Sequence, residues 1–223
     1  MMRIWQGLAL MLALGWLGCG AAQDGAPATT DGSVAAPQGA TELKAVAPAA
    51  QTAEATVSKQ FLVKTNKGEL VLELDYAKAP QTCANFEHYV AKGHYTGTVF
   101  HRVIPTFMVQ GGGLDSTLTE RSQDPPIENE AANGLLNTRG TIAMARTGAV
   151  HSATSQFFIN VVDNDFLNFR SPDPQGFGYC VFGHVVKGME VVDAIRNVAT
   201  GNQGMYQNVP LQPVVIESVT LVK

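Results

Sequence analysis

The sequence predicts a mainly β fold, an antiparallel barrel or sandwich capped by two helices. Many short segments alternate apolar and polar residues, and Gly, Pro, Asn or Asp bounds each of them. Only two segments have helical spacing, one early and one late, and strands and helices do not alternate as they do in parallel-sheet proteins. These patterns occur between residues 60 and 223, a normal size for one domain.

Composition narrows the class of protein further. The 223 residues are 45% hydrophobic and include only 3 Cys, which excludes a disulfide-stapled miniprotein and a multi-span membrane protein. The formal net charge is −4 and no basic run is present. We therefore expect no nucleic-acid partner, because phosphate binding needs clustered Lys and Arg.

Residues 1–18 read as a signal peptide. Arg3 precedes an apolar run that is too short to span a bilayer comfortably. Cys19 follows directly, and this junction resembles a bacterial lipoprotein signal, although Trp16 stands where Leu is usual. Two alternatives stay open: lipidation of Cys19 as the mature N-terminus, with the protein anchored to the outer membrane, or cleavage after Ala21 or Ala22, which releases a soluble periplasmic protein.

Residues 19–59 form a predicted disordered tether. They are rich in Ala, Pro and Thr and have few large apolar side chains, so they cannot offset the entropy of ordering. A flexible chain of this length reaches roughly 30 to 40 Å. It either holds residues 60–223 off a membrane or acts as a simple spacer.

The predicted elements follow from local patterns. Residues 61–65 and 69–74 alternate with period two around Asn66-Lys67-Gly68, which indicates a β-hairpin. A helix is expected near 80–92, beginning at Pro80 and stopping before Gly93. A second helix is expected near 188–196, from apolar residues at helical spacing. Further strands are predicted at 99–104, 107–110, 141–144, 156–160, 179–182 and 213–222.

Residues 100–113 contain the densest cluster of chemically useful side chains. Period-two alternation would put Phe100, Arg102 and Ile104 on one face, and His101 and Val103 on the other. This stretch resembles the cyclophilin family of peptidyl-prolyl cis/trans isomerases, whose signature FHRVIPxFMxQGG is intact. The resemblance continues through 140–146, 155–159 and 179–183, and residues 138–146 with 163–167 look most like the periplasmic bacterial branch.

The resemblance implies a closed eight-stranded antiparallel barrel capped by two α-helices, with the active groove on its outer face. By position, Arg102 is then the catalytic residue, and Gln110 binds the substrate backbone. The implied proline pocket consists of Phe107, Met108, Phe158 and Leu167, and the adjoining groove of Ala145 and Gln156. Three positions depart from common family types: Tyr179 replaces His, Arg146 replaces Asn and Phe166 replaces Trp.

Two departures predict altered binding. Phe166 lacks the indole N–H that can hydrogen-bond cyclosporin, so we expect weak inhibition by that drug. Arg146 adds a positive charge beside the groove, so we expect a preference for peptides with an acidic residue near proline.

The implied chemistry matches the residue types. Rotation about an X-Pro bond loses amide resonance over a barrier of about 18 to 20 kcal/mol and leaves a lone pair on the prolyl nitrogen. A charged donor such as Arg102 can stabilise that twisted state, while an apolar pocket holds the proline ring. No nucleophile, metal or cofactor is needed. The expected partners are proline-containing peptides and unfolded client proteins, and we expect a monomer that assists folding of secreted or envelope proteins.

Several alternatives remain. Arg102 could be a barrel-edge residue with a carboxylate partner, and the domain could be a non-catalytic peptide-binding or chaperone module on the same scaffold. A tethered adhesion or assembly protein is a third reading. We interpret His101 as structural, because the reaction moves no proton. Cys83 and Cys180 stand in apolar surroundings, so we interpret them as small buried hydrophobic residues. Two cysteines alone do not prove a disulfide.

Overall fold

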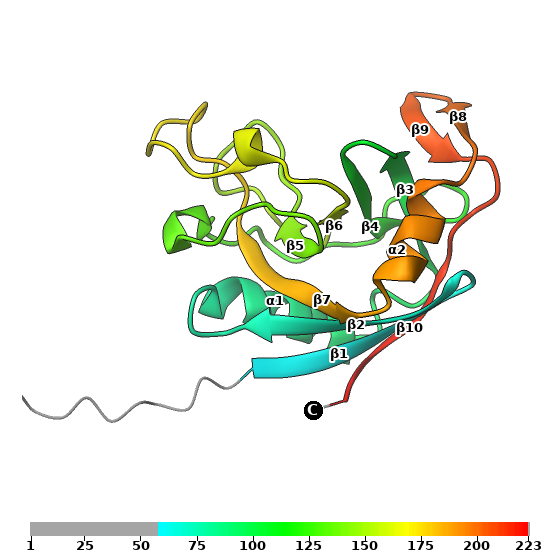
Figure 1. Cartoon of the computed structure of the whole chain (residues 1–223), viewed down its shortest axis with the longest axis horizontal. Coiled ribbons are helices and arrows are strands. Elements are labelled where there is room, and N and C mark those ends of the chain that lie inside the picture. Colours follow the sequence, from blue (N-terminus) through cyan, green and yellow to red (C-terminus); the bar gives the residue numbers. More distant parts are fainter. Residues whose placement is uncertain (1–57, 223) are drawn as a thin grey trace, which may run out of the picture. The chain divides into compact units, whose positions relative to one another are not determined.

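The computed structural model describes residues 58–222, which form one barrel with two α-helices (Figure 1). The predicted signal peptide, Cys19 and nearly all of the predicted tether lie outside the described residues. Ser58 and Lys59, assigned to the tether from the sequence, instead pair with Asp75 and Leu74 in the first hairpin. Within residues 58–222, no helix has the length and apolar character needed to cross a membrane.

Eight strands form one antiparallel sheet in the order β10-β1-β2-β7-β5-β6-β4-β3. Backbone contacts between β3 and the two residues just before β10 close it: Phe100 N donates to Val214 O at 2.9 Å, and Val99 bridges Val215. The predicted closed eight-stranded barrel is therefore confirmed. The strands are β1 (Ser58–Thr65), β2 (Gly68–Asp75), β3 (Thr98–Ile104), β4 (Met108–Asp115), β5 (Thr141–Met144), β6 (Phe157–Asn160), β7 (Val181–Lys187) and β10 (Ile216–Leu221).

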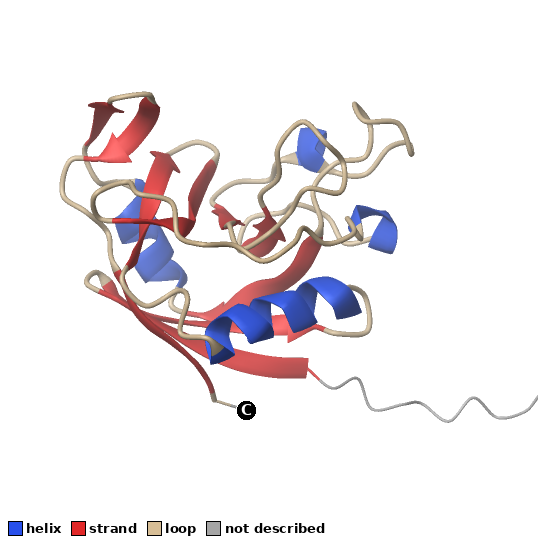
Figure 2. Ribbon diagram, turned by 180° about the vertical axis from the view of Figure 1, so that it is seen from behind, coloured by secondary structure: helices blue, strands red, loops and turns tan. Residues whose placement is uncertain are grey.

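Both predicted helices are present, as α1 (Pro80–Ala91) and α2 (Met189–Arg196). Figure 2 shows α1 toward the viewer and Figure 1 shows α2 toward the viewer, so the helices cover opposite sides of the barrel. The start of α1 has no capping side chain of its own. Glu130 supplies that function, because its carboxylate accepts hydrogen bonds from the Thr82 backbone N–H and hydroxyl at 2.8 and 2.6 Å.

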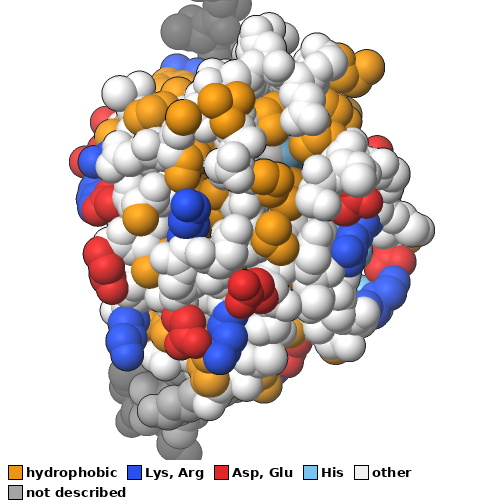
Figure 3. Space-filling model, turned by 90° about the vertical axis from the view of Figure 1, so that its right-hand side faces the viewer, with side chains coloured by type: hydrophobic (Ala, Val, Ile, Leu, Met, Phe, Trp, Pro, Cys, Tyr) orange, Lys and Arg blue, Asp and Glu red, His pale blue; other side chains and the backbone are white. Residues whose placement is uncertain are grey.

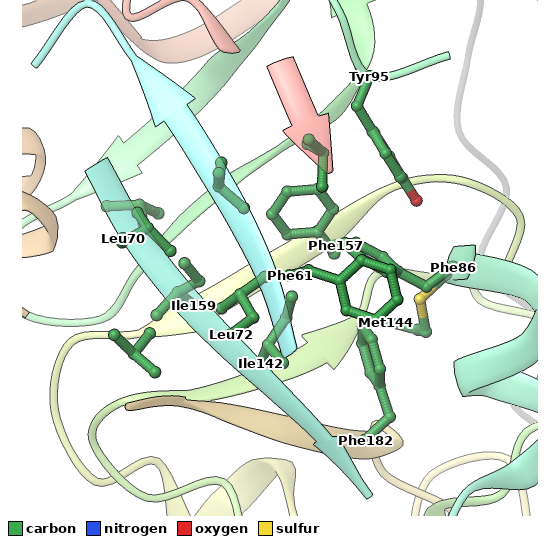
Figure 4. Packing of buried hydrophobic residues seen from close by; sticks show 14 of the residues in the cluster. Phe61, Leu70, Leu72, Phe86, Tyr95, Ile142, Met144, Phe157, Ile159 and Phe182 are labelled. Carbon is green, nitrogen blue, oxygen red and sulfur yellow. The ribbon is translucent and has the colours of Figure 1, made fainter. Parts of the chain in front are cut away.

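Aromatic side chains fill the barrel interior. Phe86 on α1 lies with its ring centroid 5.0 Å from that of Tyr95, 5.5 Å from Phe61 and 5.7 Å from Phe182. These rings pack among aliphatic side chains from facing strands, as Figure 4 shows. Helix α1 therefore closes the barrel by inserting a large side chain, whose removal typically costs about 3 to 5 kcal/mol.

Several predicted boundaries differ from the structure by one to five residues, most of all in β4 and β7. Strand β4 continues beyond Gln110 through the glycines to Asp115, and β7 begins at Val181 rather than Tyr179 and extends to Lys187. A second sheet, the hairpin of β8 (Thr200–Gln203) and β9 (Tyr206–Pro210), lies in a segment with no predicted element. Short 3-10 turns at Ala131–Asn133 and Asp165–Leu167 were likewise not predicted.

Cys83 and Cys180 are free and buried, as the sequence interpretation favoured. The Cys83 thiol donates to Phe182 O at 3.4 Å, and the Cys180 sulfur lies 3.4 Å from the Thr82 hydroxyl. Burial raises the pKa of Cys180 to about 11 and raises the pKa of Cys83 further. Both side chains are therefore thiols, packed as small hydrophobes.

Candidate active site

A groove of about 270 Å³ opens on the outer face of the barrel. It contains every residue predicted for catalysis and substrate binding except Gln156. The lining residues are Arg102, Phe107, Met108, Gln110, Ala145, Arg146, Phe158, Phe166, Leu167 and Tyr179. Gln156 lines an adjacent hollow of about 160 Å³ that shares Gln110, Ala145 and Arg146 with the groove. Residues scattered over nearly eighty positions of sequence therefore meet at one site.

The floor of the groove is a hydrophobic cluster separate from the barrel interior. Its buried members are Met108, Ala143, Phe158, Leu167 and Val181. They come from β4, β5, β6, β7 and the turn Asp165–Leu167, so the sheet carries one apolar cluster on each face. An apolar pocket of this kind can hold a proline ring through its hydrocarbon surface.

A β-bulge aims Arg102 into the groove. Phe100 pairs with Gly111 but Arg102 pairs with Gln110, so His101 is an extra residue in β3. Because Gly111 and Gln110 point to opposite faces of β4, their partners on β3 do so too. Phe100 is consequently buried in the barrel interior while Arg102 is half-buried outside. The prediction that Phe100 and Arg102 share a face is wrong, since strict alternation does not survive a bulge.

A chain of amides orients the Arg102 guanidinium. Its Nη1 donates to Gln110 Oε1 at 3.4 Å, and Gln110 Nε2 donates to Gln156 Oε1 at 3.1 Å. The guanidinium carbon lies 5.8 Å from the centroid of the Phe107 ring. Among the residues that the structure describes, no carboxylate forms an ion pair with Arg102, so the barrel-edge ion pair considered above is not seen. Its charge is available to a bound substrate.

Arg146 lines the same groove and contacts Gly178 and Tyr179. Its Nε donates to Gly178 O at 2.9 Å and its Nη1 to Thr147 O at 3.0 Å. The guanidinium carbon also lies 4.7 Å from the centroid of the Tyr179 ring, which in turn packs edge-on against Phe158 at 5.8 Å. These contacts fix the side chain without neutralising its charge.

Phe166 forms an exposed lip of the groove. It projects from the turn Asp165–Leu167 with 61% of its surface accessible, and its ring centroid lies 5.5 Å from that of Phe107. The position predicted to lack a hydrogen-bond donor is therefore open to a bound ligand.

Three buried asparagines hold the backbone beneath this lip, and sequence reasoning missed them. Asn164 Nδ2 donates to Phe107 O at 2.9 Å and to Asn160 Oδ1 at 2.7 Å. Asn160 Nδ2 donates to Asn137 Oδ1 at 3.2 Å, and Asn137 Nδ2 donates to Leu167 O at 3.2 Å. The network joins the two segments that carry Phe107 and Leu167. The only signal in the sequence was Asn beside apolar residues, which usually indicates a turn.

The histidines show no catalytic arrangement. His101 is buried, and burial lowers its pKa to about 4, with the Arg102 charge acting in the same direction. It is therefore neutral at physiological pH. His88 contacts Asp124 and His94 contacts the Gly112 carbonyl. Within residues 58–222, no group of three His, Cys, Asp or Glu side chains is arranged to hold a metal ion.

Comparison with known proteins identifies the family. Residues 60–221 match the family model described as cyclophilin type peptidyl-prolyl cis-trans isomerase/CLD. Peptidyl-prolyl cis-trans isomerase B of Escherichia coli is 59% identical over 157 residues, covering 70% of this chain and 96% of the relative. Peptidyl-prolyl cis-trans isomerase A of Dickeya dadantii is 56% identical over 169 residues, covering 76% and 87%.

Solved structures agree with this match. The chain is similar to a Cryptosporidium parvum cyclophilin type isomerase, with a TM-score of 0.64 and 26% identity over 74% of this chain and 98% of that one. A second structure of that protein, determined in the presence of the dipeptide Ala-Pro, gives a TM-score of 0.63.

Proposed function

The chain belongs to the cyclophilin-type peptidyl-prolyl cis-trans isomerases and has their activity, and from this premise we propose that Arg102 is its catalytic residue. The observation that carries the proposal is the β3 bulge, which places the Arg102 guanidinium beside an outward-facing apolar pocket. Within residues 58–222 that guanidinium has no carboxylate partner. Proline-containing peptides are the substrates.

Different residues of the groove hold the proline ring, stabilise the twisted amide and bind the substrate backbone. Phe107, Met108, Phe158 and Leu167 hold the proline ring, so one end of the X-Pro bond is fixed while the preceding carbonyl turns. The Arg102 guanidinium donates to the prolyl nitrogen once its lone pair localises, which favours the twisted amide over both planar forms. Gln110 both orients Arg102 and can bind the substrate backbone.

Measuring isomerisation of a short Ala-X-Pro peptide by purified protein lacking residues 1–19 tests this mechanism. Arg102→Ala should lose about 10²-fold or more in kcat/KM while its circular dichroism spectrum stays unchanged. Arg170→Ala is the matched control, since Arg170 is exposed and outside the groove. If Arg102→Ala retains wild-type activity, the proposed role is wrong. An inactive wild type would favour a non-catalytic peptide-binding module.

We propose further that the enzyme works outside the cytoplasm, in the periplasm or anchored to the outer membrane. The apolar run in 1–18, Cys19 and the Ala-, Pro- and Thr-rich composition of 19–59 support this proposal. We expect a labelled fatty acid to be incorporated into the wild type but not into Cys19→Ala. We also expect that variant to be released from the membrane fraction. Unlabelled protein found only in the soluble envelope fraction would favour cleavage after Ala21 or Ala22.

In that compartment the proposed clients are unfolded or proline-rich secreted and envelope proteins. The proposal rests on the activity and on the signal-like N-terminus. Capture with an Arg102→Ala bait from envelope extract should enrich such proteins over an empty matrix. Recovery of no client above the matrix control would contradict it.

A further inference from the structure

A third hollow, of about 570 Å³, adjoins the groove. Arg102, Gln110 and Arg146 line both, so the two are continuous. The far wall of this third hollow is Met205, Tyr206 and Gln207, at the tip of the β8–β9 hairpin. A segment not recognised in the sequence therefore borders the proposed catalytic arginine.

The tip of the hairpin has a defined conformation. Gln203 pairs with Tyr206, so Gly204 and Met205 form a two-residue turn, and Gly204 has φ +60°, which favours glycine. Strand β9 packs against β3, the strand that carries Arg102. The position of Met205 is thus coupled to the strand that carries the arginine.

Met205 is the most exposed large hydrophobic residue among those the structure describes, with 87% of its surface accessible. Hydrophobic side chains gather in the upper part of the molecular face that includes this hairpin, whereas charged side chains gather lower (Figure 3). An exposed apolar side chain beside a binding groove is a candidate contact, and the flexible thioether of methionine adapts to varied partners.

We propose that the hairpin tip extends the substrate-binding surface and that Met205 contacts an apolar side chain flanking the proline of an extended client segment. The uncharged far wall, Met205, Tyr206 and Gln207, favours an apolar residue on that side, while the charged Glu120 and Arg146 line other parts of the hollow. The inference rests on the proposed function, because it places the proline of the same segment in the first groove.

Three peptides test the proposal: a short Ala-Ala-Pro-Ala peptide and two longer ones with either Leu or Ser at each of the three positions before and after the same core. In Met205→Ala, the ratio of kcat/KM for the Leu peptide to kcat/KM for the short peptide should fall about threefold to tenfold. Met205→Leu should restore it. Leu211→Ala is the matched control, since Leu211 is 66% exposed after the same hairpin but lies outside the hollow.

The outcomes separate failure of the proposed Met205 contact from failure of the proposed function. An unchanged ratio in Met205→Ala, an equal fall in Leu211→Ala, or an equal fall for the Ser peptide would overturn the proposed contact. Failure of the proposed function looks different, because Arg102→Ala would then isomerise the short peptide as fast as the wild type does.

Discussion

The side-chain Nδ2 of Asn164 donates a hydrogen bond to the Phe107 carbonyl oxygen at 2.9 Å. This bond connects the turn that carries Phe166 and Leu167 to the segment that carries Phe107. Asn164 is almost fully buried, so loss of its amide leaves the Phe107 carbonyl with one hydrogen bond fewer, the remaining one coming from Val161 N. The buried Asn160 Oδ1 also loses its hydrogen bond from Asn164, the one it accepts among the described residues, and burial of an unmet polar group costs about 1 to 3 kcal/mol. The walls of the groove therefore depend on Asn164, a side chain that does not line it.

Asn164→Ala should lower the free energy of unfolding by about 1 to 3 kcal/mol and raise KM for an X-Pro peptide more than it lowers kcat. The reason is that the pocket loosens while Arg102 keeps its hydrogen bond to Gln110 on β4. Urea unfolding and steady-state kinetics measure the two effects. Asn197→Ala, an exposed amide bonded to Asp193 O, is the control, and equal KM values in the two variants would contradict the prediction.

Stability should fall in acid because of His101. Burial places its folded pKa near 4, whereas the unfolded chain has the ordinary value near 6.5. The unfolded state thus binds the proton first, and the stabilisation present above pH 6.5 is lost as pH falls toward 4, by up to roughly 3 kcal/mol. His101→Gln should flatten the dependence of unfolding free energy on pH between 4 and 6.5. A parallel dependence in both proteins would rule out this role.

Phe166→Trp should increase inhibition by cyclosporin. Phe166 is an exposed lip beside Phe107, so an indole in its place can present an N–H to a ligand in the groove. One added hydrogen bond corresponds to an increase in affinity of about three- to tenfold. Inhibition titrations of the variant and the wild type at equal peptide concentration measure the change, and identical inhibition curves would contradict the argument.

Arg146→Ala should reduce the preference for peptides with an acidic residue near proline. The backbone carbonyls that hold Arg146 leave its charge in place beside the groove. We expect the ratio of kcat/KM for Glu- and Gln-containing peptides to fall about two- to fivefold at low ionic strength, and the effect to shrink in salt. Arg170→Ala serves as the comparison, and an unchanged ratio in Arg146→Ala would remove the idea.

Local sequence patterns predicted the elements that have an amphipathic face or clear turn and capping residues. The first hairpin and α1 have clear alternation, turn residues and a proline start, and both lie close to their predicted positions. The β8–β9 hairpin was missed because its residues are mostly polar. It packs against β3, which is remote in sequence, and the periodicity of a segment does not report such long-range contacts.

The site shows the same division. The residues that the family resemblance grouped together line one groove, apart from Gln156. The direction in which Arg102 points depends instead on the bulge at His101, and register is a property of two strands. Asn137, Asn160 and Asn164 were invisible for a related reason. Each looks like a turn former until the fold places its amide against another.

The pairing of β1 with β10 brings the two ends of the barrel's chain together, which permits circular permutation. Val222 N donates to Gln60 O at 2.8 Å, so the first and last strands end side by side. A few linking residues could join these ends, and new termini could be opened in the exposed loop at 172–175, away from every strand of the barrel. Such a circularly permuted enzyme would retain all the strand pairings while its new termini lie in that loop.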